Sequence, residues 1–228
     1  MTTTEQILAL AAHPTPTAEA DAGLARFAEA ADAGMNSHLV RAVRNLRPAD
    51  DGHAWRAWLS ATAALSAPGG AAASGAVPSG AAPSGAAPGG AAPADGPVVT
   101  TVVCAAATAL GEDCSAAVAA GSQAAALAEA GLAPAVGWSV PVVSAAIGAG
   151  LAAGLMMGLG EAQLRSALGI CATQAAGLRA AAGTDAAPLQ AGKAAFNAIE
   201  AAQLARLGFT SSREPLDGRR AFFPLLSS

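Results

Sequence analysis

The sequence predicts an all-α fold, a helical bundle interrupted by a disordered Ala/Pro/Gly linker, and three observations lead to this prediction. Apolar residues make up 53% of the 228 residues, but aromatic residues only 4%, and tyrosine is absent. A core with few aromatic side chains has to be built from Ala, Leu, Val and Gly, which suits closely packed helices better than a β-sandwich. Apolar residues also recur at helical spacing, and proline or glycine stands at the ends of the periodic segments.

The N-terminal segment, residues 1–66, is predicted to form four short helices. The first covers 4–12 and starts at Thr4, while the second has Thr17 as its N-cap and runs to residue 33, where Gly34 stops it. The third covers 37–46 and the fourth 53–65. The fourth carries the bulky residues of this segment, which are Trp55, Trp58, Leu59 and Leu65.

Residues 67–97 differ from the rest of the chain in composition. From Ala76 they contain a near-perfect five-residue repeat, AVPSG-AAPSG-AAPGG-AAP. Proline and glycine recur too often for a helix or a strand, so the segment is predicted to be a disordered low-complexity linker. It lacks the basic flank and the strict PxxP spacing of a polyproline ligand.

Residues 98–228 are predicted to form a further helical domain. Gly183 and Gly208 are the predicted ends of two helices, and Pro188 falls in the first turn of the last long helix, where proline is tolerated. The predicted helices cover 98–110, 113 or 114 to 130, 139 or 141 to 159, 161–182, and 188–207.

Residues 130–160 raise the question of a membrane span, because they contain no ionisable side chain and are long enough to cross a bilayer. Gly150, Gly154 and Gly158 also have the small-xxx-small spacing of helix pairs in lipid. However, Pro134 and Pro141 interrupt the stretch, and no Arg or Lys flanks it closely. We therefore favour a buried central helix over a membrane-associated protein.

Charge and cysteine usage exclude several classes of function. The net charge is −4 without a basic run, so nucleic-acid binding is not expected. The three cysteines show no CxxC or Cys/His ligand spacing, and Gly148-x-Gly150 follows no predicted strand, so neither a metal site nor a cofactor is predicted. Residues 1–10 lack the basic region of a signal peptide, and the expected location is cytoplasmic.

Two strings of residues carry a family resemblance. The first is Gly137-Trp138-Ser139, before a helix rich in small residues, and the second is GTDAAPLQAGKAA, residues 183–195. With these strings, residues 97–223 resemble the helical domain of the MmgE/PrpD family, which includes 2-methylcitrate dehydratase, cis-aconitate decarboxylase and iminodisuccinate epimerase. The resemblance implies a helical fold and a lyase-type activity on a small carboxylic acid. It also implies a larger second domain after the helical one.

The sequence departs from the family at the reactive positions. Where the family has a histidine, a lysine and a second histidine, this chain has Ser139, Ala187 and Gln190, and the linker replaces the family's acidic, His-containing loop. Serine and glutamine hydrogen-bond a carboxylate, but neither titrates near pH 7, as general acid–base catalysis requires. No catalytic residue is therefore carried over from the resemblance.

Lys193, the only lysine of the chain, defines the candidate site. At about 100° per residue, it shares one arc of the last long helix with Asn197, Glu200 and bulky apolar residues. A lysine held there binds a substrate carboxylate, or acts as a base if its pKa is lowered; the alternative is a lysine that reaches the surface while its stem packs. The predicted substrate-binding residues are Trp138, Ser139, Thr184, Gln190, Lys193 and Asn197, and the catalytic candidates are Lys193, Glu200 and Asp185.

Other polar residues are predicted to have structural roles. His13, His38 and His53 are expected to be solvated or to cap helices. The arginines at 213, 219 and 220 surround Glu214 and Asp217; internal ion pairing is expected there, and the alternative is that they hold an anionic ligand.

Two functional hypotheses remain from this reasoning. The first is a relative of the lyases that binds a small carboxylic acid or acts on it, with dehydratase, decarboxylase or isomerase chemistry as the reaction type. The second is a catalytically inactive helical module that serves as an interaction surface or partner subunit. In either case exposed Ala/Leu faces predict a homo-oligomer.

Overall fold

The computed structural model describes residues 1–47, 49–67, 97–132 and 137–226, and across these ranges the fold is all-α, as predicted. No strand occurs in the described ranges, where a single antiparallel bridge pairs Trp138 with Leu178. Most of the predicted linker, residues 68–96, lies outside the described residues. The helices before it are α1 Thr3–Leu10, α2 Ala18–Gly34, α3 His38–Leu46 and α4 His53–Ser66. Those after it are α5 Pro97–Thr108, α6 Ser115–Gly131, α7 Val140–Met156, α8 Glu161–Gln174, η2 Arg179–Ala181, α9 Ala186–Arg206 and α10 Phe222–Leu226.

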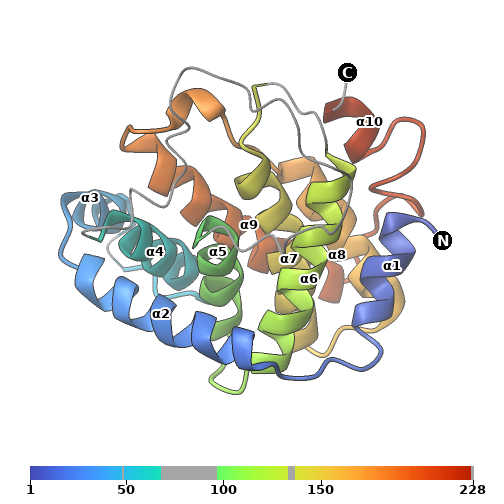
Figure 1. Cartoon of the computed structure of the whole chain (residues 1–228), viewed down its shortest axis with the longest axis horizontal. Coiled ribbons are helices and arrows are strands. Elements are labelled where there is room, and N and C mark those ends of the chain that lie inside the picture. Colours follow the sequence, from blue (N-terminus) through green and yellow to red (C-terminus); the bar gives the residue numbers. More distant parts are fainter. Residues whose placement is uncertain (48, 68–96, 133–136, 227–228) are drawn as a thin grey trace, which may run out of the picture.

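Helix α7 lies at the centre of the bundle and explains the charge-free part of the sequence (Figure 1). It packs against α5, α6, α8 and α9, and every residue from Val142 to Gly154 is buried. A helix that is apolar all round belongs inside a protein or a membrane. No helix among the described residues has the length and apolarity that a membrane crossing requires. The prediction of a buried central helix is therefore confirmed.

Close contact between α6 and α7 depends on two glycines. A Cβ atom at Gly148 would overlap the carbonyl oxygen of Gly121, and a Cβ at Gly121 would lie 2.8 Å from the carbonyl oxygen of Gly148. The two backbones therefore touch directly. Most of the buried residues of α6 are alanines, whose small side chains suit such a close approach.

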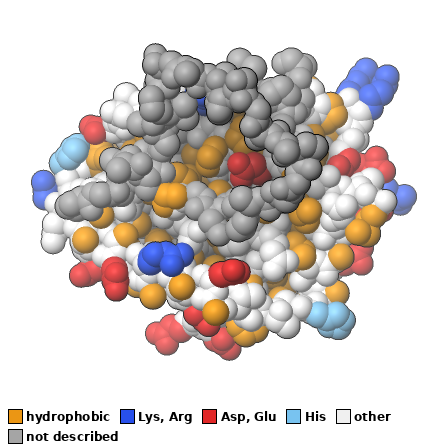
Figure 2. All heavy atoms as spheres, in the orientation of Figure 1, with side chains coloured by type: hydrophobic (Ala, Val, Ile, Leu, Met, Phe, Trp, Pro, Cys, Tyr) orange, Lys and Arg blue, Asp and Glu red, His pale blue; other side chains and the backbone are white. Residues whose placement is uncertain are grey.

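One continuous hydrophobic core joins helices from both sides of the predicted linker. Buried residues of α1, α2 and α4 belong to the same cluster as those of α5 to α9. The division of the chain into 1–66, 67–97 and 98–228 remains a prediction about its sequence. Figure 2 shows acidic and basic side chains distributed over the visible part of one face, with several acidic ones near one another along its lower edge.

Capping hydrogen bonds support two of the predicted helix starts, and a third start is corrected. Thr17 caps α2 by accepting a hydrogen bond from the Ala20 amide, and Ser37 caps α3 in the same way through Val40. Helix α1, however, begins before Thr4. Its cap is Thr2, which accepts from the Glu5 amide while the Glu5 carboxylate accepts from the Thr2 amide, a reciprocal capping box.

The prediction of one continuous helix over 161–182 is wrong, because α8 ends at Gln174. Beyond it, the Gly177 carbonyl oxygen accepts a hydrogen bond from the Ser139 amide at 2.9 Å, and the Arg179 amide donates to the Gly137 carbonyl at 3.0 Å. These long-range bonds occupy the backbone groups that a helix would use, so tertiary contacts outweigh the helical periodicity. Pro188 lies in the first turn of α9, as predicted.

Candidate functional site

The two strings of residues that carry the family resemblance meet at the extended segment 175–178, between α8 and η2. Trp138 pairs with Leu178 through the antiparallel bridge, and the Ser139 amide binds the Gly177 carbonyl. From the other string, Gln190 accepts from the Leu178 amide at 3.0 Å and donates to the Leu178 carbonyl at 3.4 Å. The structure thus brings Trp138, Ser139 and Gln190 together around one short segment.

Asn197 and Glu200 are joined to the same region by Gln174, a residue that the sequence reasoning missed. The Asn197 side-chain amide donates to the backbone carbonyl of Gln174 at 3.2 Å, and the side-chain amide of Gln174 donates to the Glu200 carboxylate at 3.4 Å. The side-chain oxygen of Gln174 is buried and has no hydrogen-bond partner among the described residues. Its only signal in the sequence is that it is the last polar residue before the Ala-Ala-Gly run at 175–177.

Lys193 lies against an aromatic wall formed by Phe196 and Trp58. Its ammonium nitrogen is 3.6 Å from the ring centroid of Phe196 and 5.1 Å from that of Trp58, which comes from α4. Each contact is a cation–π interaction. Within the described part of the chain, the ammonium has neither a hydrogen-bond acceptor nor an ion-pair partner, and the buried indole nitrogen of Trp58 also lacks an acceptor.

The environment of Lys193 changes its acidity. Partial burial lowers the pKa of the Lys193 ammonium, the Glu200 carboxylate opposes this by raising it, and the Arg47 charge adds to the lowering. Burial is the largest of these effects, so the net pKa lies below the ordinary lysine value. Lys193 therefore combines an unpaired half-buried charge with easier loss of its proton.

Thr184 and Asp185 lie apart from this group, in the exposed turn before α9. The Thr184 hydroxyl donates to the Ala181 carbonyl at 2.7 Å, which stabilises the turn. The Asp185 carboxylate is 3.2 Å from the Nε2 atom of His38, with both side chains about 70% exposed. His38 is solvated as predicted, whereas Nδ1 of His53 lies 2.6 Å from the Ala109 carbonyl oxygen.

The predicted pairing of the C-terminal arginines is wrong. Among the described residues, Arg213, Arg219 and Arg220 form no ion pair with Glu214 or Asp217. The reason is that the Asp217 carboxylate is hydrogen-bonded to the start of α1. It accepts from the Thr3 amide at 3.1 Å, and from the amide and the hydroxyl of Thr4, each at 2.8 Å; we call this group the terminal clasp.

Two pockets of the described structure are formed by other residues than those predicted. One of about 810 Å³ lies between α8 and the segment 210–226, and one of about 340 Å³ lies among α2, α5 and α6. None of the predicted site residues lines either pocket. Within the described ranges, no three His, Cys, Asp or Glu side chains gather as metal ligands would.

An alanine-rich helical domain with its two family strings joined at 175–178 defines the class of protein. The chain belongs to the MmgE/PrpD family, since the model of the MmgE/PrpD N-terminal domain matches residues 49–228. The matched range begins before the resemblance at 97–223 and includes α4, which supplies Trp58 to the Lys193 site. A search among curated proteins gave no match.

Proposed function

We propose that this protein is a lyase-type member of the MmgE/PrpD family which binds a small carboxylic acid, with the Lys193 ammonium contacting the ligand carboxylate. The observation that carries the proposal is the half-buried Lys193 ammonium, which lacks an acceptor among the described residues. Leaving a charged donor unpaired away from water is costly, and an incoming carboxylate removes this cost.

The polar groups around Lys193 favour an anionic ligand. The Lys193 ammonium and the indole nitrogen of Trp58 are both donors without partners among the described residues. An ionised carboxylate offers only acceptors, so it complements both donors at once. Gln174 and Asn197 fix the neighbouring surface through their bonds between α8 and α9.

For the lyase step, we propose that the Lys193 ammonium first loses its proton to solvent, and that the neutral amine then takes a proton from the carbon next to the carboxylate. Its lowered pKa supports this, since a base works best when its pKa is near the working pH. In a dehydration, the C–H proton goes to the lysine nitrogen and the C–O bond pair leaves with the hydroxyl group. Ser139 and Gln190 serve as positioning residues, because neither titrates.

A thermal-shift panel tests binding with citrate, methylcitrate, cis-aconitate and aspartate-derived dicarboxylates. A ligand at about 100 times its dissociation constant adds about 2.7 kcal/mol of stability if it binds only the folded state. We expect at least one acid to give a saturable shift that Lys193→Ala abolishes. Arg206→Ala is the matched control, because it removes an exposed cation from the same helix.

Two outcomes would contradict the proposal. Binding at this site is refuted if no acid shifts the melting temperature, or if Lys193→Ala and Arg206→Ala retain the shift equally. The proton-transfer step has its own test, which is exchange of the C–H proton of the bound acid in D2O, followed by NMR. Binding without exchange would leave the ligand site in place and reject Lys193 as the base.

We also propose that the protein is a cytoplasmic homo-oligomer. Leu178, Leu207 and Phe209 are large apolar residues with exposed fractions of 59%, 76% and 58%, which a subunit interface would cover. The three cysteines are free thiols, which suits a reducing compartment. Light scattering on the purified protein tests the oligomer, and a monodisperse monomer would contradict it.

A further inference from the structure

The pocket of about 810 Å³ between α8 and the segment 210–226 has features of a second ligand site. Its volume falls in the range of about 300–1,000 Å³ typical of small-molecule pockets. It is far larger than a small dicarboxylic acid needs, and it shares no residue with the Lys193 site. Its lining is Gly169, Ile170, Ala172, Thr173, Ala175, 210–215, 218–222, Leu225 and Leu226.

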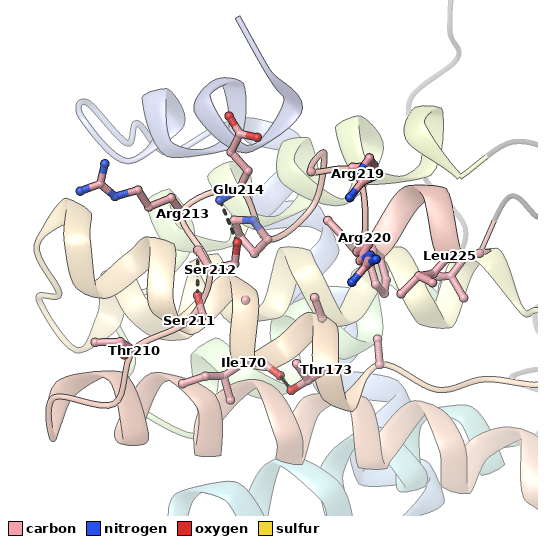
Figure 3. Close-up of a pocket in the computed structure, with 18 residues that line it drawn as sticks. Ile170, Thr173, Thr210, Ser211, Ser212, Arg213, Glu214, Arg219, Arg220 and Leu225 are labelled. Atoms are coloured by element: carbon pink, nitrogen blue, oxygen red, sulfur yellow. Dashed lines mark hydrogen bonds between the residues drawn. The ribbon is translucent and has the colours of Figure 1, made fainter.

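The pocket carries an excess of positive charge. Three arginines and one acidic residue, Glu214, line it, and the other nearby carboxylate, Asp217, is held by the terminal clasp. Figure 3 shows Arg219 and Arg220 together at one end of the pocket, whereas the side chains of Arg213 and Glu214 are directed away from them. The guanidinium groups of Arg219 and Arg220 form no hydrogen bond or ion pair with any described residue.

Two of the hydroxyl groups in the pocket donate hydrogen bonds within the protein. The Thr173 hydroxyl donates to the Ile170 carbonyl at 2.7 Å, and the Ser211 hydroxyl contacts the Arg165 carbonyl at 3.3 Å. The Ser212 hydroxyl accepts from the Glu214 amide. Arg219 and Arg220 are charged donors without a partner among the described residues, and a guanidinium fork binds a carboxylate through two parallel hydrogen bonds.

The rest of the pocket wall is apolar and held in place. Ile170, Ala172 and Ala175 come from α8 and its end, and Phe222 comes from α10. A Cβ at Gly169 would overlap the side chain of Ser211, so the loop lies directly on α8. With the terminal clasp on the same loop, the pocket is formed before any ligand arrives, which lowers the entropy cost of binding.

From these observations we infer that the pocket binds an organic carboxylate with an apolar body, such as a medium-chain acid, with Arg219 and Arg220 holding the carboxylate. The apolar wall takes the chain of the ligand. This site is separate from the Lys193 site, so it does not depend on the proposed small-acid function.

Isothermal titration with octanoate tests the inference, with octanamide as the neutral counterpart and inorganic phosphate as an anion without an apolar body. Octanoate is expected to bind, with octanamide and phosphate each weaker by about tenfold or more, since one lacks the charge and the other the apolar contact. Arg219→Ala/Arg220→Ala is expected to weaken octanoate by at least about tenfold. Arg206→Ala is the matched control, because it removes an exposed arginine that does not line the pocket, and it should leave octanoate binding unchanged.

Three results would overturn the inference. If octanamide binds as tightly as octanoate, the arginines do not recognise the negative charge of the ligand. If the double variant binds octanoate as tightly as the wild type, the ligand lies elsewhere. No binding of octanoate would reject the site. Lys193→Ala separates the two proposals, since it should abolish the small-acid shift and leave octanoate binding intact. Because Arg219 and Arg220 are exposed, the double variant is expected to keep the wild-type melting temperature.

Discussion

Replacing Gly148 by Ala tests whether the direct backbone contact between α6 and α7 organises the bundle. The new methyl group would overlap the Gly121 carbonyl oxygen and would lie 2.9 Å from the Cβ of Ala125. Overpacking of this kind costs about 1–3 kcal/mol, and more where the obstacle is backbone that cannot rotate away. Alanine has a better helix propensity than glycine by about 1 kcal/mol, which offsets part of the loss. We expect Gly148→Ala to lower the free energy of unfolding by about 2 kcal/mol.

The matched control is Gly154→Ala, in the same helix and equally buried. Its new methyl group meets the end of the Leu164 side chain, which can change rotamer. Both variants gain the same helix propensity, so the difference between them isolates the backbone overlap. Urea unfolding followed by circular dichroism at 222 nm gives both free energies. The reasoning is refuted if Gly148→Ala is as stable as Gly154→Ala.

Three further predictions concern single groups. Asp217→Asn is expected to cost about 1–2 kcal/mol at pH 7, because hydrogen bonds to a charged acceptor are lost. Burial alone would raise the pKa of Asp217, but the hydrogen bonds from Thr4 and Thr3 outweigh burial and lower the pKa. The stability that these bonds contribute is therefore present above about pH 4 and is lost as the pH falls through the lowered pKa. A difference in urea midpoint between wild type and Asp217→Asn that is unchanged at pH 3 would contradict this pH dependence. Thr17→Ala should cost about 1 kcal/mol by removing the α2 cap, whereas no change in urea midpoint would show that the cap is dispensable. Burial raises the pKa of the Cys104 and Cys171 thiols to about 12, so alkylation at pH 8 should be roughly a thousandfold slower than in urea, and rapid labelling of the folded protein would reject this burial.

Local signals in the sequence were sufficient for most helix starts and stops. Thr17 and Ser37 are caps that act within three residues, and Gly208, which follows α9, has a positive φ angle of 93°, which glycine adopts readily. The buried position of α7 also followed from local composition. These features depend on neighbours in the chain, so the sequence alone predicts them.

The features that escaped prediction depend on residues far apart in the chain. The end of α8 is fixed by backbone hydrogen bonds that Gly137 and Ser139 form with the segment after it, and no residue near Gln174 signals this end in the sequence. The aromatic wall beside Lys193 comes from Trp58, in a helix that precedes the linker. For the same reason the pairing of Asp217 was missed, since its partners are Thr3 and Thr4 rather than the arginines beside it.

The terminal clasp has a consequence for the order of folding. Each of its hydrogen bonds joins two residues that are 213 or 214 positions apart in the chain. The clasp therefore closes a loop that contains nearly the whole domain. Closing such a loop is entropically expensive until the intervening helices are packed, and the clasp therefore forms at the end of folding. It is also among the first contacts to open when the native state fluctuates, because releasing α1 exposes far less apolar surface than opening α7. The contact between the two ends of the domain thus forms after the centre of the bundle has packed.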